Sequence, residues 1–426
     1  MTGTTTVIPQ RELVGDDKVG ILPKRVNSLA LARQLATSLD LQNCDDAFMV
    51  ADLDHIVDRF NLWKKELPMI EPFYAVKCNT DPVLVRCLAA LGTGFDCASR
   101  EEIDIVMKMG VSADRIIYAN PCKTRSFITH AKEKEVRMMT FDNAEELLKI
   151  SMLHPTAQMI LRIAVSDPTA TCPLNLKFGC DPELVAPKLL KRAAELGVDV
   201  IGVSFHVGSG CNDANAYRLA LQHTKNIFEI GEGLGFNMRM VDLGGGFPGA
   251  EHHLPFEKIA QVIRNALDEF FEDSSVRIVA EPGRYFAAGT FSLVTNVLHA
   301  TQVPAFKITK NEKDERVGYM YYLNDGVYGS FNCILFDHVH PSGEPLFSTG
   351  GANYITTIWG PTCDSLDMIE TKKMMPKMEI GDWIYYSNMG AYTSAAATTF
   401  NGFAKPNVVY IMSAEMWTSI RSSPHV

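Results

Sequence analysis

A lysine stands at the end of a short apolar run, within the motif P-F-Y-A-V-K-C-N at Pro72 to Asn79. Burial among apolar neighbours disfavours the charged ammonium and therefore lowers the pKa of a lysine. A neutral amine at Lys77 could then attack an aldehyde and form a Schiff base. Alternatively, Lys77 lies at the rim of the fold, with its apolar stem on the protein and its ammonium in water.

Two glycine-containing motifs further along the chain predict a site for a phosphate group. The first is D-L-G-G-G-F-P at Asp242 to Pro248, where consecutive glycines let backbone N–H groups approach an anion. The second is E-P-G-R at Glu281 to Arg284, which adds a guanidinium suited to paired hydrogen bonds with phosphate. Two ordinary turns would give the same pattern, so both interpretations remain open from these motifs alone.

A histidine and a cysteine are further candidates for chemistry. His206 lies in S-F-H-V-G-S-G at the end of an apolar run, although a lone histidine there is more often a core residue. Cys363 lies in W-G-P-T-C-D-S-L-D, beside carboxylates, although a buried structural thiol is the more common case. No metal-ligand spacing accompanies either residue, so we expect no metal.

The elements that must position these residues follow a regular alternation. Eight apolar or β-branched runs recur, most of them separated by segments of helical spacing, which predicts a parallel (β/α)₈ barrel. In such barrels the C-terminal strand ends carry the chemistry. The eight runs end at Lys77, Asp96, Asn120, Asp142, Arg162, His206, Gly244 and Glu281.

After Arg284 the pattern changes to strand-like runs without regular helices between them. The sequence therefore predicts an α/β fold with two domains. Residues 46–284 form the barrel, and residues 1–45 together with 285–426 form a second, mostly antiparallel β domain, resembling a sandwich or a small barrel.

Composition narrows the class of partner. The net charge is −10 and the basic residues form no long cluster, which argues against nucleic acid and anionic membranes. No apolar stretch reaches the length of about 18 residues needed to cross a bilayer, and the first 20 residues lack the pattern of a secretory signal. The ten cysteines include no C-x-x-C pair, so we expect free thiols and a cytoplasmic location.

Taken in order, these motifs resemble the barrel-type pyridoxal-phosphate-dependent amino-acid decarboxylases over about Phe48 to Gly402. Two further sequence motifs, N-D-G-V-Y-G-S-F-N-C at Asn324 to Cys333 and F-N-G-F at Phe400 to Phe403, resemble the eukaryotic ornithine decarboxylase branch. The resemblance implies that pyridoxal 5'-phosphate is the cofactor of the barrel. It also implies decarboxylation of L-ornithine to putrescine and CO₂, a step of polyamine biosynthesis.

The resemblance also implies residue roles at the cofactor. Lys77 would hold the cofactor as a Schiff base, Glu281 would face the pyridine nitrogen, and His206 would stack on the ring. Asp96, Glu102 and Arg162 would form a charged shell around the imine. The remaining cofactor-binding residues, most of them around the phosphate, would be Ser209, Gly244, Gly245, Gly246, Pro282, Gly283, Arg284 and Tyr392.

At the substrate, the resemblance gives Cys363 the role of protonating the α-carbon after CO₂ leaves. Phe336, Asp337 and Asp364 would bind the rest of the substrate. Many family members have tyrosine where this chain has Phe336, so we expect altered affinity without loss of function. Relatives that use diaminopimelate have Cys-Glu where this chain has Cys363-Asp364, and the C-terminal half does not resemble the racemases.

The family's quaternary structure implies a homodimer with shared active sites, in which Cys363 reaches across the interface and Lys177 pairs with Asp367 of the other subunit. Antizyme is a candidate partner, through the segment Lys123 to Leu148, which would otherwise be a solvated helix face. Two alternatives remain. One is a lysine or arginine decarboxylase of the same family, and the other is an inactive homologue that regulates through antizyme.

Overall fold

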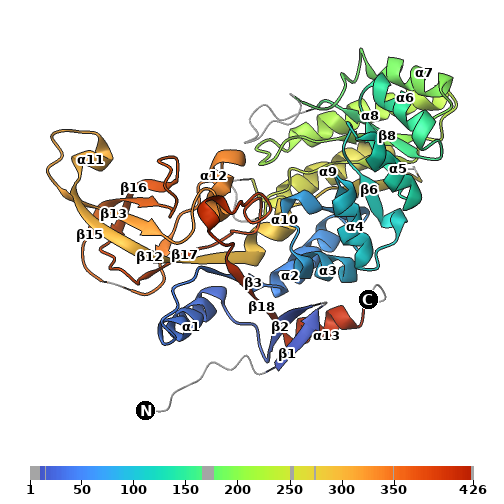
Figure 1. Ribbon diagram of the computed structural model, residues 1–426. Coiled ribbons are helices and arrows are strands. Elements are labelled where there is room, and N and C mark those ends of the chain that lie inside the picture. Colours follow the sequence, from blue (N-terminus) through green and yellow to red (C-terminus); the bar gives the residue numbers. More distant parts are fainter. Residues whose placement is uncertain are drawn as a thin grey trace. The chain divides into compact units, whose positions relative to one another are not determined.

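The computed structural model describes residues 10–14, 16–165, 177–249, 254–272, 275–348 and 350–423. These residues form two compact units, which we call the barrel unit and the sheet unit (Figure 1). The barrel unit comprises Asp58–Phe286 with Ser423–Val426, and the sheet unit comprises Met1–Val57 with Ala287–Ser422. The cysteines that are described are all free thiols, whereas Cys172 lies outside the described residues.

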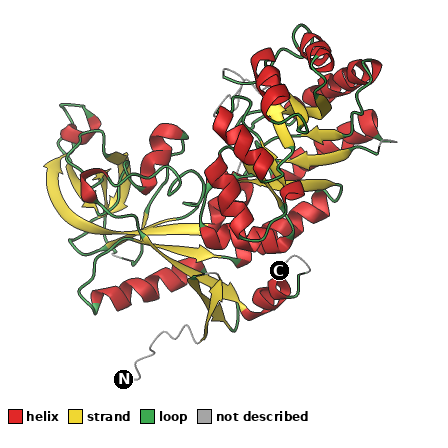
Figure 2. Ribbon diagram, turned by 45° about the vertical axis from the view of Figure 1, so that its right-hand side comes forward, coloured by secondary structure: helices red, strands yellow, loops and turns green. Residues whose placement is uncertain are grey.

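Eight parallel strands close into a barrel, in the order β10-β11-β4-β5-β6-β7-β8-β9. All eight predicted runs correspond to these strands, so the predicted barrel is confirmed. Figure 2 shows helices around the barrel strands. The strands are β4 (Ile70–Ala75), β5 (Gly94–Cys97), β6 (Ile116–Tyr118), β7 (Met138–Phe141), β8 (Gln158–Ile163), β9 (Asp199–Phe205), β10 (Met240–Asp242) and β11 (Arg277–Ala280).

Local signals set the ends of the barrel helices. At α3 (Pro82–Leu91) the Asp81 carboxylate accepts hydrogen bonds from the backbone N–H groups of Val83 and Leu84, and the helix ends at Gly92 with φ 89°. The other helices of this unit are α4 (Arg100–Lys108), α5 (Arg125–Glu133), α6 (Ala144–Leu153), α7 (Ala186–Glu195), α8 (Asn215–Gly233) and α9 (Phe256–Phe271). Two further helices, α2 (Asp54–Glu66) and α10 (Arg284–Ala287), span the boundaries between the units.

Large apolar side chains fill the interior of the barrel. Phe73, Ile117, Met138, Ile160, Ile201, Met240 and Val279 form one buried cluster. Side chains two residues apart on a strand point to the same side. Thr140, Arg162 and Asp242 each follow a member of this cluster by two residues, so a polar layer lies between the apolar plug and the C-terminal mouth.

The sheet unit contains one mostly antiparallel, ten-stranded sheet, as predicted in its strand direction. It is a single sheet because β12 (Phe291–Pro304) is long: its first half pairs with β3 (Phe48–Asp52) and β17 (Trp383–Tyr386), and its second half pairs with β13 (Val317–Leu323). The other strands are β1 (Gln10–Val14), β2 (Asp17–Leu22), β14 (Glu344–Pro345), β15 (Asn353–Trp359), β16 (Met368–Pro376) and β18 (Asn407–Ser413).

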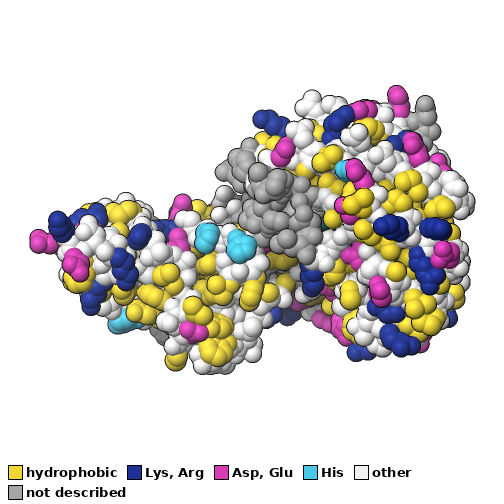
Figure 3. All heavy atoms as spheres, turned by 90° about the horizontal axis from the view of Figure 1, so that it is seen from above, with side chains coloured by type: hydrophobic (Ala, Val, Ile, Leu, Met, Phe, Trp, Pro, Cys, Tyr) yellow, Lys and Arg dark blue, Asp and Glu magenta, His cyan; other side chains and the backbone are white. Residues whose placement is uncertain are grey.

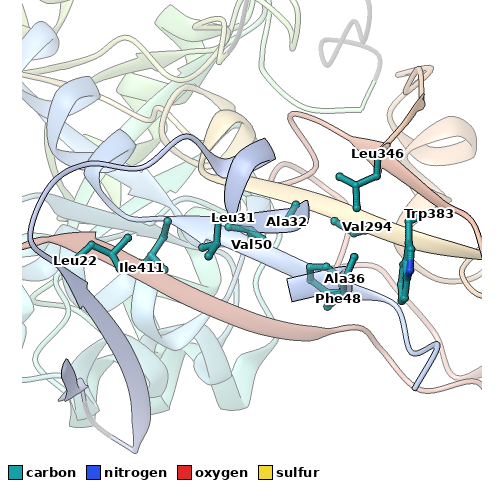
Figure 4. Close-up of a cluster of buried hydrophobic side chains, with 10 residues drawn as sticks. All are labelled: Leu22, Leu31, Ala32, Ala36, Phe48, Val50, Val294, Leu346, Trp383 and Ile411. Atoms are coloured by element: carbon teal, nitrogen blue, oxygen red, sulfur yellow. The ribbon is translucent and has the colours of Figure 1, made fainter. Parts of the chain in front are cut away.

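The division in the structure differs from the expected boundary at residue 46. Strand β3 pairs with β12 and β18, so the segment up to Val57 belongs to the sheet unit. The core of the sheet unit is formed where the helix α1 (Ser28–Asp40) packs its buried face on the sheet. Figure 4 shows this cluster, which consists of Leu22, Leu31, Ala32, Ala36, Phe48, Val50, Val294, Leu346, Trp383 and Ile411.

The sheet unit also contains the short helices α11 (Phe306–Thr309) and α12 (Cys333–Phe336) and the helix α13 (Ala414–Arg421). Among the described residues, no helix has the length and apolar character required to cross a membrane. On the face drawn in Figure 3, basic and acidic side chains are interspersed over the surface.

Candidate active site

Lys77 lies just beyond the end of β4, in the 3₁₀ turn η1 (Val76–Cys78). Its ammonium forms an ion pair with the carboxylate of Asp96, which is fully buried on the neighbouring strand β5. The Lys77 side chain is 41 % exposed, so of the two interpretations of Lys77 the exposure agrees with a lysine at the rim and not with an amine buried among apolar neighbours. The reason is local: the lysine follows the strand in a turn, where its side chain reaches the mouth of the barrel.

Glu102 lies behind this pair, in the first turn of α4. Its carboxylate accepts a hydrogen bond from the Ala98 N–H at 2.6 Å, while the Ser99 hydroxyl accepts one from the Glu102 N–H at 3.2 Å. Ser99 thus caps the first turn of α4, and the Glu102 carboxylate accepts from the N–H of the residue that precedes the cap. Burial raises the pKa of Glu102, and the charge of Asp96 adds to the increase.

His206 follows β9 directly. Its Nδ1 accepts a hydrogen bond from the Gly208 N–H at 3.0 Å, so a neutral ring carries its proton on Nε2. Burial, followed by the positive charges of Arg162 and Lys77, holds the pKa of His206 well below its ordinary value. The ring is therefore neutral at physiological pH.

The glycine loop after β10 can exist only with glycine at its critical positions. Gly244 and Gly246 have φ values of 61° and 108°. A Cβ on Gly244 would lie 2.1 Å from the Phe205 carbonyl oxygen, and one on Gly245 would lie 2.7 Å from Nε2 of His206. The loop thus lies directly against the histidine ring, with open backbone where a side chain would otherwise be.

Arg284 begins α10, and its guanidinium donates a hydrogen bond to the Ser209 hydroxyl at 3.3 Å. The neighbouring residues of its motif are packed closely: the Pro282 carbonyl accepts from the Ala75 N–H at 3.3 Å, and a Cβ on Gly283 would lie 2.9 Å from that of Cys78. Ser209, the glycine loop and Arg284 therefore gather after three consecutive strands. A serine hydroxyl, backbone N–H groups and a guanidinium are the donors that a phosphate requires.

Two acidic residues lie beside this loop, and sequence reasoning noticed only one of them. Glu281 follows β11, and its N–H donates to the Gly244 carbonyl at 2.7 Å. Asp242 ends β10, is fully buried, and accepts from the Gly244 N–H at 2.9 Å. Burial raises the pKa of both carboxyl groups, and their mutual repulsion raises that of Glu281 well above its ordinary value. Asp242 could have been found from its position, because it follows the inward-facing Met240 by two residues on the same strand.

The remaining predicted residues lie in the sheet unit. Cys363 is exposed, and its N–H donates to the Asn401 side chain at 3.2 Å. The Asp364 carboxylate accepts a hydrogen bond from the Tyr328 hydroxyl, which holds the pKa of that carboxyl below its ordinary value. Tyr328 in turn stacks on Phe400, with ring centroids 4.5 Å apart. This contact was not anticipated from the sequence.

Phe336 and Asp337 are adjacent, at the end of α12, but differ in environment. Phe336 is 69 % exposed, whereas Asp337 is buried. Tyr392 is half-buried and has a φ of 54°, which is an uncommon backbone conformation for a tyrosine. The structure thus divides the predicted site residues between the two units.

The expected ion pair between Lys177 and Asp367 of the other subunit stays a prediction, and the structure shows the contacts of Asp367 within its own chain. Asp367 is buried, and both of its oxygens accept hydrogen bonds from its own chain. The donors are the N–H of Val327 at 2.7 Å and the N–H and hydroxyl of Thr362 at 2.9 and 2.6 Å. Asp367 therefore fixes the loop that carries Cys363 and Asp364.

Fold and site together define a barrel enzyme with a lysine at its mouth and donors for a phosphate. Residues 53–288 match the family described as "Pyridoxal-dependent decarboxylase, pyridoxal binding domain". The chain belongs to this family of pyridoxal-dependent decarboxylases.

Individual relatives narrow the comparison. The chain is 70 % identical to "Ornithine decarboxylase" of Caenorhabditis elegans, over 99 % of this chain and 100 % of the relative. It is 48 % identical to "Antizyme inhibitor 2" of Xenopus laevis, over 87 % of this chain and 82 % of that relative. The solved structure of the arginine decarboxylase of Paramecium bursaria Chlorella virus bound to agmatine is 34 % identical, with a TM-score of 0.84 over 90 % of this chain and all of that one.

Proposed function

We propose that this chain catalyses the pyridoxal-phosphate-dependent decarboxylation of L-ornithine to putrescine and CO₂. The observation that carries the proposal is the barrel mouth, where Lys77, Glu281 and the phosphate donors around Arg284 lie at successive strand ends. The 70 % identity to the nematode ornithine decarboxylase supports the choice of substrate.

The residues of the barrel mouth fit pyridoxal phosphate. Lys77 would bind it covalently, His206 would lie on its ring and Glu281 would face its nitrogen, with Asp96, Glu102 and Arg162 around the lysine. Ser209, the Gly244 to Gly246 loop, Arg284 and, from the sheet unit, Tyr392 would bind the phosphate. When bound, the cofactor supplies an electron sink for the charge that develops as CO₂ leaves.

The chain's own groups would then orient the substrate and control protons. Asp96 holds the ammonium of Lys77 in place in the cofactor-free chain and would lie beside the same nitrogen when the cofactor is bound. A diamino acid also brings a second ammonium, whose burial requires carboxylate partners. Asp364 and Asp337 are our candidates for this role, with Phe336 beside them, and Cys363 is our candidate for the donor of the proton to the α-carbon.

We also propose that the active enzyme is a cytoplasmic homodimer in which Cys363 and Asp364 serve the partner's barrel. The exposure of Cys363 supports this, because a donor that serves another subunit must be reachable from outside its own chain. The product would enter polyamine synthesis. Antizyme binding through Lys123 to Leu148 is a further part of the proposal, to be tested by copurification of purified antizyme with the enzyme.

The second candidate is an inactive regulator, because an antizyme inhibitor is among the relatives. This chain retains Lys77, Asp96, His206, Arg284, Cys363 and Asp364, which favours the enzyme. The test is to measure the visible absorption of the purified protein with pyridoxal phosphate, together with CO₂ release from ornithine, lysine and arginine. Absence of both the band and CO₂ release would favour the regulator, and a higher kcat/KM for lysine or arginine would change the substrate.

A further inference from the structure

Asp242 and Glu281 bring two carboxyl groups together beneath the glycine loop. Asp242 pairs in register with Val279 on β11, so Glu281 lies two residues beyond that partner, toward the barrel mouth. One backbone turn links them, because Gly244 donates to Asp242 and accepts from Glu281. The two side chains interact directly, and Oδ2 of Asp242 is buried without a hydrogen-bond partner among the described residues.

The surrounding charges do not balance if every acid is ionised. Asp96 on β5 is a third carboxylate facing Glu281, and it is paired with Lys77. Arg162 on β8 is the positive group that acts on Asp242, and His206 beside the loop is neutral. The three acids Asp96, Asp242 and Glu281 therefore share the two cations Lys77 and Arg162, and Glu102 beside Asp96 brings a further carboxyl and no positive charge. An unmatched buried charge is costly, so one acid retains a proton. Burial and the charge of Asp242 assign that proton to Glu281, whose pKa they raise most.

We propose that Asp242 keeps Glu281 protonated in the cofactor-free chain, and that Glu281 surrenders this proton when the cofactor's ring nitrogen binds beside it. If the nitrogen arrives protonated, the proton of Glu281 goes to solvent, leaving a carboxylate beside the N–H. If the nitrogen arrives neutral, the same proton passes from Glu281 to the nitrogen and none is released. Asp242 is thus a positioning residue for the proton. The inference rests on the proposed cofactor site.

The test is calorimetric titration with pyridoxine 5'-phosphate, which has no aldehyde and cannot react with Lys77. Titrations in two buffers of different ionisation enthalpy, at a pH where the free ring nitrogen is protonated, give the number of protons released. We expect the wild-type protein to release about one proton more per site than Asp242→Asn, because the variant leaves Glu281 ionised before binding. An asparagine at 242 can still accept from the Gly244 N–H, so the loop is preserved.

Two further variants complete the design. Glu281→Gln has no carboxyl to lose a proton and should match Asp242→Asn. Ser204→Ala, in register with Asp242 on β9 but without charge, should match the wild-type protein. Equal proton release by wild type, Asp242→Asn and Glu281→Gln would overturn the inference while leaving the cofactor site standing. Failure of the wild-type protein to bind pyridoxal phosphate itself would overturn the proposed function and the inference together.

Discussion

Arg284 is the residue whose removal best separates cofactor binding from chemistry. Its guanidinium already holds Ser209 at 3.3 Å, on the side of the glycine loop where we place the phosphate. Charge-assisted hydrogen bonds contribute about 1.5–3 kcal/mol each, so Arg284→Ala should raise the dissociation constant of pyridoxal phosphate at least about tenfold. Turnover at saturating cofactor should change much less.

The measurement is a fluorescence or absorbance titration of the cofactor-free protein. A matched control is Arg218→Ala, which removes an arginine paired on the surface with Glu269. That variant should bind the cofactor like the wild-type protein. An unchanged dissociation constant in Arg284→Ala would show that the phosphate lies elsewhere.

His206 gives a prediction about pH. Its pKa is held well below the ordinary value, first by burial and then by Arg162 and Lys77. The ring should therefore show no titration step between about pH 6 and 8 in the NMR spectrum of histidine-labelled, cofactor-free protein. The signal is assigned by its loss in His206→Gln. A step in this range would mean that the ring is protonated near neutrality.

The lowered pKa of His206 also makes the stability of the fold depend on pH. A histidine with a lowered pKa in the folded chain binds its proton more readily when unfolded. Its contribution therefore reduces the free energy of unfolding as the pH falls below about 6.5, the ordinary pKa of histidine. Above that pH the contribution is constant.

Single residues also show where sequence reasoning stopped. Lys77, Glu281 and Arg284 were recognisable because their motifs lie at strand ends, where residue type reflects chemistry. Two hydrogen bonds join residues that are far apart in sequence, namely Tyr328 with Asp364 and Val327 with Asp367. No local spacing in the sequence predicts them. Lys77 was assigned correctly to a strand end, but its exposure depended on a turn that the apolar run did not reveal.

At the level of elements, the loop from Gly360 to Asp367 depends on one buried carboxylate. Asp367 accepts hydrogen bonds from Val327 and Thr362 and is buried, whereas Asp364 on the same loop is only half-buried. Asp367→Ala would leave these donors unpaired and should lower the free energy of unfolding by about 2–4 kcal/mol. Asp364→Ala should leave stability nearly unchanged and raise the KM for ornithine.

Urea denaturation and steady-state kinetics of the two variants test this contrast. Asp367→Asn serves as the intermediate case, because its side-chain oxygen can accept only part of the hydrogen bonds. Equal loss of stability from both alanine variants would contradict the assignment of Asp367 as the residue that fixes the loop.

The elements themselves were largely predictable, for a physical reason. Buried parallel strands are short apolar runs, and the eight runs of the barrel were clear in the sequence. The boundary expected at residue 46 leaves strand β3 with the barrel, whereas the structure places it in the sheet unit. Only its pairing with β12 and β18 distinguishes it, and pairing partners leave no local signal.

At the scale of the whole molecule, the proposed shared sites predict complementation. Lys77→Ala and Cys363→Ala should each be nearly inactive alone. In a random mixture of subunits, half of the dimers combine the two variants, and one of their two sites receives both intact residues. Activity should then recover to about a quarter of the wild-type value.

The control is a mixture of Lys77→Ala with Glu281→Ala, whose altered residues both lie in the barrel unit. That mixture should remain inactive, since every site carries one of the two changes. Absence of recovery in the first mixture, after subunit exchange is verified by mass, would mean that each chain builds its own site.

The strand β18 has a consequence for how the chain is made. It pairs in parallel with β2 and β3, so Tyr410 lies beside both Val19 and Ala51. During synthesis the first strands emerge long before their partner, while the barrel between them has already been translated. The barrel can therefore fold on the ribosome as an inserted module. The edges of β2 and β3 that pair with β18 stay unpaired until β18 has been synthesised. Chaperones that shield strand edges would act on this chain at its amino-terminal end.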